Sequence, residues 1–120
     1  MNRISHFLRA KTQYNLHSPL VFRLYTEALF SRAPGRGRSF EDVVWRLEQY
    51  YGLTHSQFPV PRAPLSTPDG EMLVVDRPHR DETSWQALCA DPRYQVTLDL
   101  YRCGICIANP RLSRQHFILR

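Results

Sequence analysis

Glu71-Met-Leu-Val-Val-Asp76 and Tyr94-Gln-Val-Thr-Leu-Asp-Leu-Tyr101 lie in the stretch that decides the fold, residues 71–120. The first segment is a short apolar run closed by a charge, which is typical of a buried strand. The second segment alternates along its length. We therefore expect its even-numbered residues, among them Leu98, to face the core, and its odd-numbered residues, among them Asp99, to face the more polar side of a sheet.

Two more strands and one helix complete this region. Strands are expected over 104–108 and 116–119, and a helix over 81–89 connects the first two strands, with Trp85 and Leu88 facing the sheet. The expected order is β-α-β-β-β, in a mixed sheet of three to four strands. This order predicts an α/β (or α+β) fold.

The first 52 residues are expected to form a helical part that packs beside the sheet. Apolar periodicity predicts helices over 4–10, 19–30 and 39–51, and Gly52 stands where a glycine commonly ends a helix. Residues 53–70 contain four prolines and show no clear periodicity. We expect them to form an irregular connector between the helices and the sheet.

The chain of 120 residues is expected to be a single domain, residues 1–120, because it is long enough for one modest core but not for two. No run of about 18 apolar residues occurs, so no membrane-spanning helix is expected. The N-terminus lacks the apolar region of a secretory signal. Three cysteines, an odd number, do not suggest a disulfide framework, and we expect a cytoplasmic protein.

Positive charge is concentrated at the beginning of the chain. Residues 1–38 contain seven Lys and Arg against one acid, Glu27, whereas residues 39–120 contain nine against ten. A segment this basic attracts phosphates or an acidic protein surface. Solvated charge on helix surfaces explains the same pattern, and both interpretations stay open here.

Two sets of residues are shared with a known family. Near the N-terminus they are Ala10-Lys11, Asn15-Leu-His-Ser-Pro-Leu-Val-Phe22 and Tyr25, and in the C-terminal half they are Leu73-Val-Val-Asp76, Pro78-His79, Trp85, Val96-Thr-Leu-Asp-Leu100, Gly104 and Gln115-His-Phe-Ile-Leu-Arg120. In these motifs the chain resembles bacterial class I S-adenosylmethionine-dependent methyltransferases of the small O-methyltransferase-like kind. The resemblance implies that residues 71–120 correspond to the family's fifth strand, the next helix, the sixth and seventh strands and a final strand.

The middle part of such an enzyme, which binds the cofactor, has no counterpart in this sequence. The family holds S-adenosylmethionine on an acidic-Gly-x-Gly loop after its first strand, because glycines let backbone N–H groups approach a ligand closely. Among five glycines only Gly35 and Gly37 have this spacing, and they lie between two expected helices with no strand before them. The resemblance therefore implies a truncated, Rossmann-like methyltransferase remnant with no cofactor-binding residues.

Asp76 and His79 are the candidates for catalytic residues. In metal-dependent relatives the fifth strand ends in an acid followed by a second oxygen ligand, which suits a hard divalent cation. Here Arg77 follows Asp76, and Arg80 stands where the family usually has an aromatic residue. Two guanidinium groups beside one carboxylate disfavour a cation and favour an ion pair. We expect no metal at this position, and an ion pair between Asp76 and one of the two arginines.

Cys103-Gly-Ile-Cys106 has the spacing of a zinc-binding pair. A structural zinc site needs four ligands and usually contains two such pairs, whereas the other candidate ligands here are Cys89, His79 and His116. We expect both cysteines of the motif to be small buried residues that bind no metal.

Three hypotheses for the function follow. The first is a degenerate methyltransferase-like protein that is not catalytic on its own. The second is one subunit of a split S-adenosylmethionine-dependent methyltransferase, whose partner chain adds the missing strands at an open sheet edge. The third is a small nucleic-acid-binding module that uses the basic residues 1–38, and whose binding falls steeply with salt.

Overall fold

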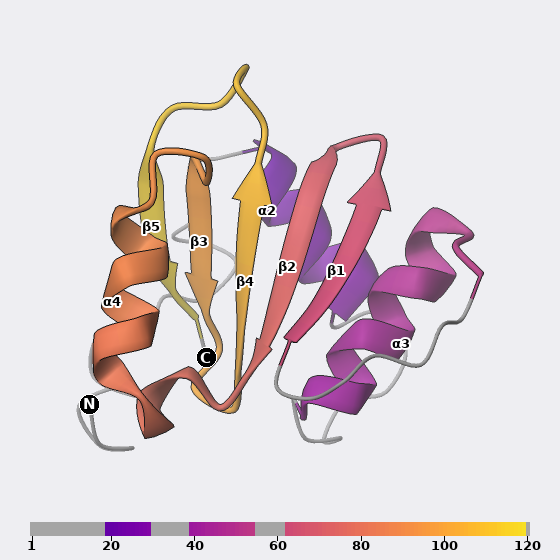
Figure 1. The fold of residues 1–120 in the computed structure, drawn as a ribbon. Coiled ribbons are helices and arrows are strands. Elements are labelled where there is room, and N and C mark those ends of the chain that lie inside the picture. Colours follow the sequence, from indigo (N-terminus) through magenta and orange to yellow (C-terminus); the bar gives the residue numbers. More distant parts are fainter. Residues whose placement is uncertain (1–18, 30–38, 55–61, 120) are drawn as a thin grey trace.

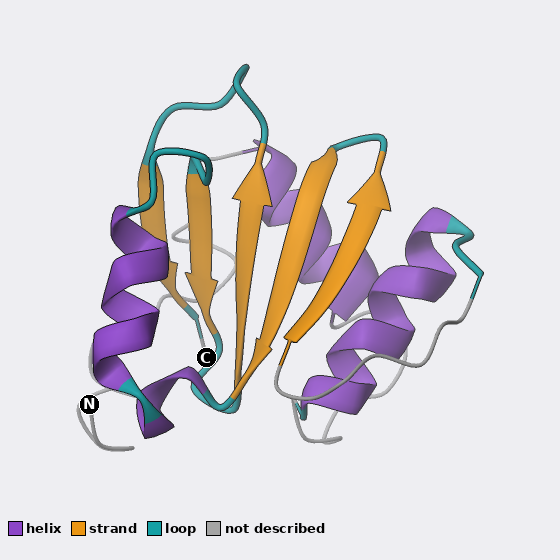
Figure 2. Cartoon of the chain, viewed as in Figure 1, coloured by secondary structure: helices purple, strands orange, loops and turns teal. Residues whose placement is uncertain are grey.

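The computed structural model describes residues 19–29, 39–54 and 62–119. In chain order its elements are α2 (Pro19–Arg23), the π-helix η2 (Leu24–Leu29), α3 (Phe40–Tyr51), β1 (Arg62–Thr67), β2 (Gly70–Asp76), the 3-10 helix η3 (Pro78–Arg80), α4 (Glu82–Ala90), β3 (Val96–Asp99), β4 (Cys103–Ala108) and β5 (Gln115–Ile118). The α/β fold class is therefore confirmed (Figure 2). The helix expected over 4–10 lies outside the described residues.

One sheet of five strands, in the order β1-β2-β4-β3-β5, forms the centre of the molecule. β4 lies between β2 and β3 and is antiparallel to both, so β2 and β3 run in the same direction. β5 is parallel to β3, and β1 is antiparallel to β2. The segment from β2 through α4 to β3 is thus a β-α-β crossover that leaves room for one strand, which β4 fills.

Helices cover both faces of this sheet, and Figure 1 shows α4 in front of it and α2 behind it. The larger apolar cluster joins α2, η2 and α3 to one face of all five strands. A smaller cluster on the other face contains Val75, Trp85, Leu88 and Cys106. Gly104 admits the indole of Trp85, because a Cβ atom at this position would lie 2.6 Å from the ring.

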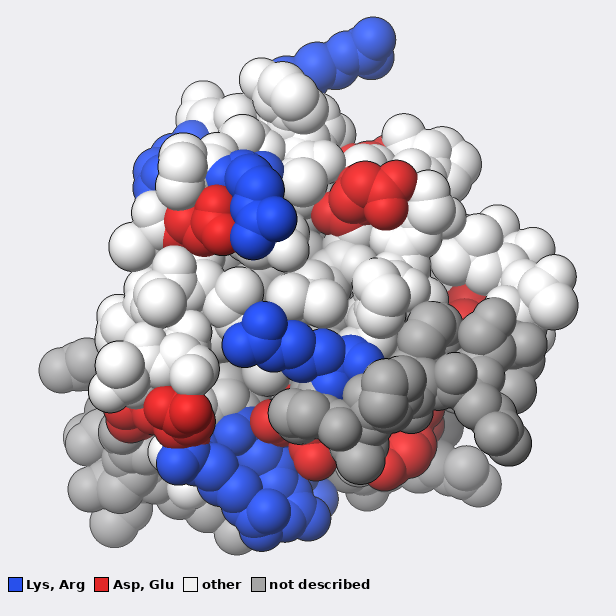
Figure 3. All heavy atoms as spheres, viewed as in Figure 1, with Lys and Arg blue, Asp and Glu red and all other residues white. Residues whose placement is uncertain are grey.

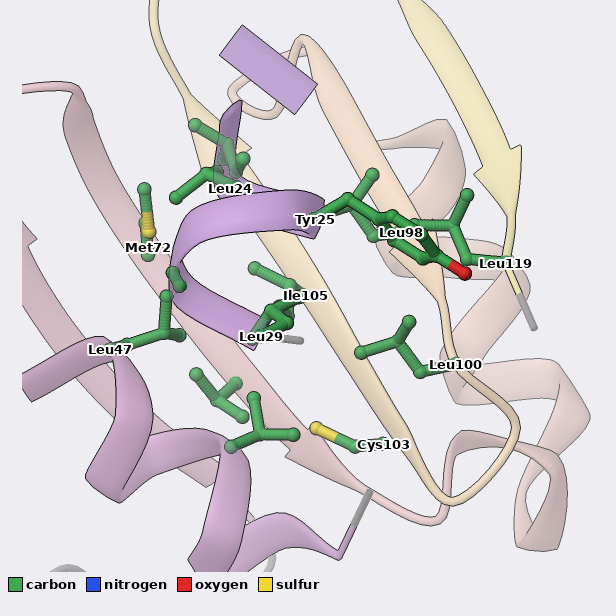
Figure 4. Close-up of a cluster of buried hydrophobic side chains, with 14 of the residues drawn as sticks. Leu24, Tyr25, Leu29, Leu47, Met72, Leu98, Leu100, Cys103, Ile105 and Leu119 are labelled. Carbon is green, nitrogen blue, oxygen red and sulfur yellow. The ribbon is translucent and has the colours of Figure 1, made fainter. Parts of the chain in front are cut away.

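The larger cluster confirms the expected direction of the even-numbered residues of β3. Leu98 is fully buried and Leu100, just after the strand, is almost so (Figure 4). The odd-numbered residues Thr97 and Asp99 are also buried, because α4 covers their side of the sheet. Alternation identified the two faces correctly, but it did not indicate that the polar face is enclosed.

The sequence-based strand count was too low, and the interpretation of 53–70 as irregular was wrong for its second half. β1 forms there, with Ala63 and Leu65 buried and Pro64 exposed. Proline is tolerated because β1 is an edge strand, where a missing N–H costs no ladder hydrogen bond. Thr67 accepts a hydrogen bond from the Asp69 backbone N–H (3.1 Å) and donates one to the Gly70 carbonyl (2.8 Å), which closes the β1–β2 turn.

The helix expected over 39–51 is confirmed, with both of its ends. The Ser39 hydroxyl accepts a hydrogen bond from the Asp42 N–H at 3.3 Å. Gly52 has φ 66°, the left-handed conformation that suits glycine at a helix C-terminus. In the described parts of the chain, no helix has both the length and the apolar character needed to cross a membrane.

Candidate functional site

A pocket of about 500 Å³ opens at the carboxyl ends of β2 and β3. Its walls come from the start of α3, from the residues that follow β2 and from the β3–β4 turn: Ser39, Glu41, Asp76, Arg77, His79, Arg80, Tyr101 and Arg102. In open α/β sheets, ligands commonly bind outside the carboxyl ends of the parallel strands. Both sequence-based candidates, Asp76 and His79, therefore line one pocket.

His79 is held between two carboxylates. Its Nε2 lies 2.6 Å from Asp99 Oδ2, and its Nδ1 lies 2.7 Å from Glu82 Oε1. The side chains of His79 and Asp99 are only 9% and 1% exposed, whereas that of Glu82 is 42% exposed. With both carboxylates ionised, both contacts are hydrogen bonds only when both ring nitrogens carry a proton and donate. Both ring nitrogens of His79 are therefore engaged by carboxylates of the protein itself.

The β3–β4 turn completes this network. Asp99 Oδ1 accepts a hydrogen bond from the Tyr101 backbone N–H at 2.9 Å, and the Tyr101 ring stacks on the His79 ring with centroids 5.6 Å apart. Tyr101 has φ 69°, a left-handed conformation that is uncommon for a residue with a side chain. Arg77 has φ 45°, so both turns that line the pocket hold a strained residue.

Asp76 lies near Arg77, as expected, but the contact is weak. Arg77 Nε is 4.0 Å from Asp76 Oδ1, and the two side chains are 53% and 28% exposed. An exposed pair at this distance contributes little to stability. Within the described residues, neither Arg80 nor Arg102 lies within ion-pair distance of a carboxylate. The pocket therefore contains more cationic groups than its own acids engage.

The basic N-terminal segment is described only over residues 19–29. Within that part Arg23 is engaged, because its Nη2 donates to Asp69 Oδ2 at 2.9 Å and its Nη1 donates to the Tyr50 hydroxyl at 3.1 Å. These contacts attach the end of α2 to α3 and to the β1–β2 turn. The remaining basic residues of 1–38 lie outside the described residues.

Cys103 and Cys106 are both fully buried on β4, as the sequence predicted. Because side chains alternate along a strand, residues three apart point to opposite faces. Cys103 accordingly belongs to the larger apolar cluster and Cys106 to the smaller one. The two thiols are separated by the sheet itself and cannot bind the same metal ion. Among the described residues, no three His, Cys, Asp or Glu side chains are grouped to hold a metal.

We expect both thiols to resist a thiol reagent in the folded protein. Burial raises the pKa of Cys106 to about 12 and also raises the pKa of Cys103, so the reactive thiolate is scarce at mildly alkaline pH. Since the unfolded state ionises first, stability falls as the pH rises above the ordinary thiol pKa. Mass spectrometry of the labelled protein should find all three cysteines modified in denaturant.

The half-buried Cys89 serves as the internal control in this experiment, and it should react before the two strand cysteines. Fast native labelling of Cys103 or Cys106 would contradict their burial. The same preparation should retain no stoichiometric zinc, and one equivalent remaining after dialysis would overturn the expected lack of a metal at this motif.

Sequence reasoning did not identify Asp99 and Tyr101 as members of the site. The available signal was their position: both lie on the odd-numbered, polar side of the alternating segment that ends at Tyr101. Because β2 and β3 are parallel, that strand end lies at the same edge of the sheet as the end of β2, with only β4 between them, and His79 follows β2. Comparisons with protein-family models, with curated proteins and with solved structures found no match to this chain.

Proposed function

We propose that this protein is a methyltransferase-like α/β domain that does not transfer methyl groups on its own and acts by binding. The order of elements supports this proposal. β2, the helix α4, β3, β4 and β5 follow one another as the resemblance requires for the last part of a class I methyltransferase. β4 lies between β2 and β3, so these two consecutive strands are not neighbours in the sheet. This arrangement is specific, because consecutive strands more commonly lie side by side.

The pairing of β1 with β2 is the observation that supports the non-catalytic part of the proposal. In the family, the strands of the cofactor-binding half precede the fifth strand, which β2 represents here. In this chain β1 is antiparallel to β2, and every residue of β1 is paired, from Arg62 opposite Val75 to Thr67 opposite Gly70. The backbone of β2 on this side is thus already used by a short hairpin.

This pairing also weighs against the split-enzyme hypothesis. A partner chain was expected to add strands at an open edge beside β2, but β1 occupies that position. The edges of the described sheet are β1 and β5, and Pro64 on β1 limits further pairing there. A complementing subunit would have to displace β1 or bind elsewhere.

The test is titration of the purified protein with S-adenosylmethionine in a calorimeter. We expect no heat beyond dilution, because hydrogen bonds to charged groups contribute only about 1.5–3 kcal/mol each and the set that a cofactor loop supplies is missing. The remaining contacts cannot offset the loss of ligand freedom on binding. A methyltransferase that binds the cofactor, titrated under the same conditions, verifies that heat is detectable.

A dissociation constant in the micromolar range for the isolated chain would refute the proposal. Binding that appears only after a second polypeptide is added would favour the split enzyme. Salt-sensitive binding of nucleic acid without any cofactor binding would favour the third hypothesis, because phosphate contacts release counterions.

A further inference from the structure

We propose that the pocket at the carboxyl ends of β2 and β3 binds a small anion of the phosphate monoester class. Three arginines line it, Arg77 and Arg80 from the segment after β2 and Arg102 from the β3–β4 turn. Figure 3 shows basic side chains gathered at the lower end of the molecule, where β2 leads towards α4. Guanidinium groups bind phosphate oxygens with two parallel hydrogen bonds, which gives both affinity and orientation.

The charges around the pocket favour an anion. Its walls contain two acids, Asp76 and Glu41, against the three arginines. Asp76 lies 4.0 Å from Arg77, and Glu41 stands in the first turn of α3, where the helix dipole stabilises a negative charge. His79 is already engaged by Glu82 and Asp99 through both of its ring nitrogens. Arg80 and Arg102 form no ion pair with an acid among the described residues, so they remain available to a ligand.

The arginines are carried by a backbone that is already organised. The Arg77 N–H donates to the Arg102 carbonyl at 2.9 Å, which joins the two turns directly. The Arg80 N–H donates to the Arg77 carbonyl at 3.0 Å, and His79, between them, is anchored to Asp99. A site whose backbone is fixed in advance loses less entropy when it binds a ligand.

A phosphate fits this arrangement better than a carboxylate or a metal cation does. The three guanidinium groups come from two separate turns, and a tetrahedral dianion offers acceptors in more directions than a planar carboxylate. Ser39 and Glu41 at the start of α3 also line the pocket, and the backbone N–H groups of this first turn that Ser39 does not cap are further donors for an anion. A divalent cation would meet three positive side chains, which disfavour it.

The test is a titration followed by amide NMR spectra of the full-length protein at constant ionic strength. Two probes are used, inorganic phosphate and ribose 5-phosphate, with sodium chloride as the reference anion. We expect saturable shifts at Arg77, Arg80 and Arg102 with both phosphates. Tighter binding of ribose 5-phosphate would identify an organic monoester as the preferred ligand, and equal affinities would indicate that the phosphate group alone is recognised.

Two variants make the result specific to the pocket. Arg80→Gln with Arg102→Gln should weaken phosphate binding at least about ten-fold, because charge-assisted hydrogen bonds are lost. Arg111→Gln, an exposed arginine outside the pocket, changes the net charge in the same direction and should leave the affinity unchanged. Both side chains of the double variant are exposed, so its thermal midpoint should match that of the parent.

The proposal fails if phosphate gives no saturable shift at these three residues, or if sodium chloride at equal ionic strength gives the same shifts. It also fails if the double variant costs no more than about twice the binding free energy that Arg111→Gln costs, because the double variant removes two charges against one and the effect would then reflect net charge alone. None of these outcomes depends on S-adenosylmethionine, so they are independent of the proposed loss of methyltransferase activity.

Discussion

The His79→Ala variant is expected to lose about 3–5 kcal/mol of unfolding free energy, the usual cost of removing one member of a buried pair. Asp99 is 1% exposed, and its Oδ2 lies 2.6 Å from His79 Nε2. Removing the imidazole takes this contact away from a carboxylate that is buried in the folded protein. Denaturant titration followed by circular dichroism gives the loss directly.

Two further variants distinguish the charge effect from the loss of packing. Glu82→Gln removes the other carboxylate that His79 contacts, and because Glu82 is 42% exposed we expect a much smaller loss. Adding Asp99→Asn to His79→Ala removes the buried charge itself, so the double variant should be more stable than His79→Ala alone. A double variant that is less stable by the sum of both single losses would contradict this account.

The Leu98→Ala variant is expected to lose about 2–5 kcal/mol, as is typical of a large-to-small substitution in a packed core. Leu98 is fully buried on β3, which has a strand on each side, and helices cover its face of the sheet. The surrounding strands are hydrogen-bonded to one another and cannot close the cavity completely. The measurement is again the unfolding free energy in denaturant.

Leu112→Ala is the matched control for this substitution. Leu112 is half-buried and packs at the margin of the same cluster, so the same truncation should cost clearly less there. Similar losses at both positions would mean that burial does not decide the effect. A loss at Leu98 below the error of the titration would contradict its place in the core.

The strands that the sequence predicted and the strand that it did not predict differ in their apolar content. Residues 71–76 and 104–108 are nearly continuous apolar runs, and a segment of this kind is buried in almost any fold that it joins. In β1 only Ala63 and Leu65 are buried, and prolines interrupt the pattern. The Pro68-Asp69-Gly70 turn between the two strands was an available hairpin signal.

The candidate site was predicted in part, because a site combines residues that the sequence keeps apart. Asp76 and His79 could be identified, since they directly follow a predicted strand. Asp99 is 20 residues from His79, and only the pairing of β4 with both β2 and β3 brings the two strand ends together. Arg102 enters the pocket for the same reason.

The sequence by itself determined the local elements: the helix that begins after Ser39 and ends at Gly52, the strands of residues 71–119 and the inward direction of Leu98. Capping, periodicity and alternation are properties of neighbouring residues, so they are present in the chain before it folds. The tertiary structure alone decided which strands are neighbours, that β1 occupies the edge beside β2, and that α4 encloses Asp99. These features depend on contacts between distant segments, whose free energy exists only when the whole sheet has formed.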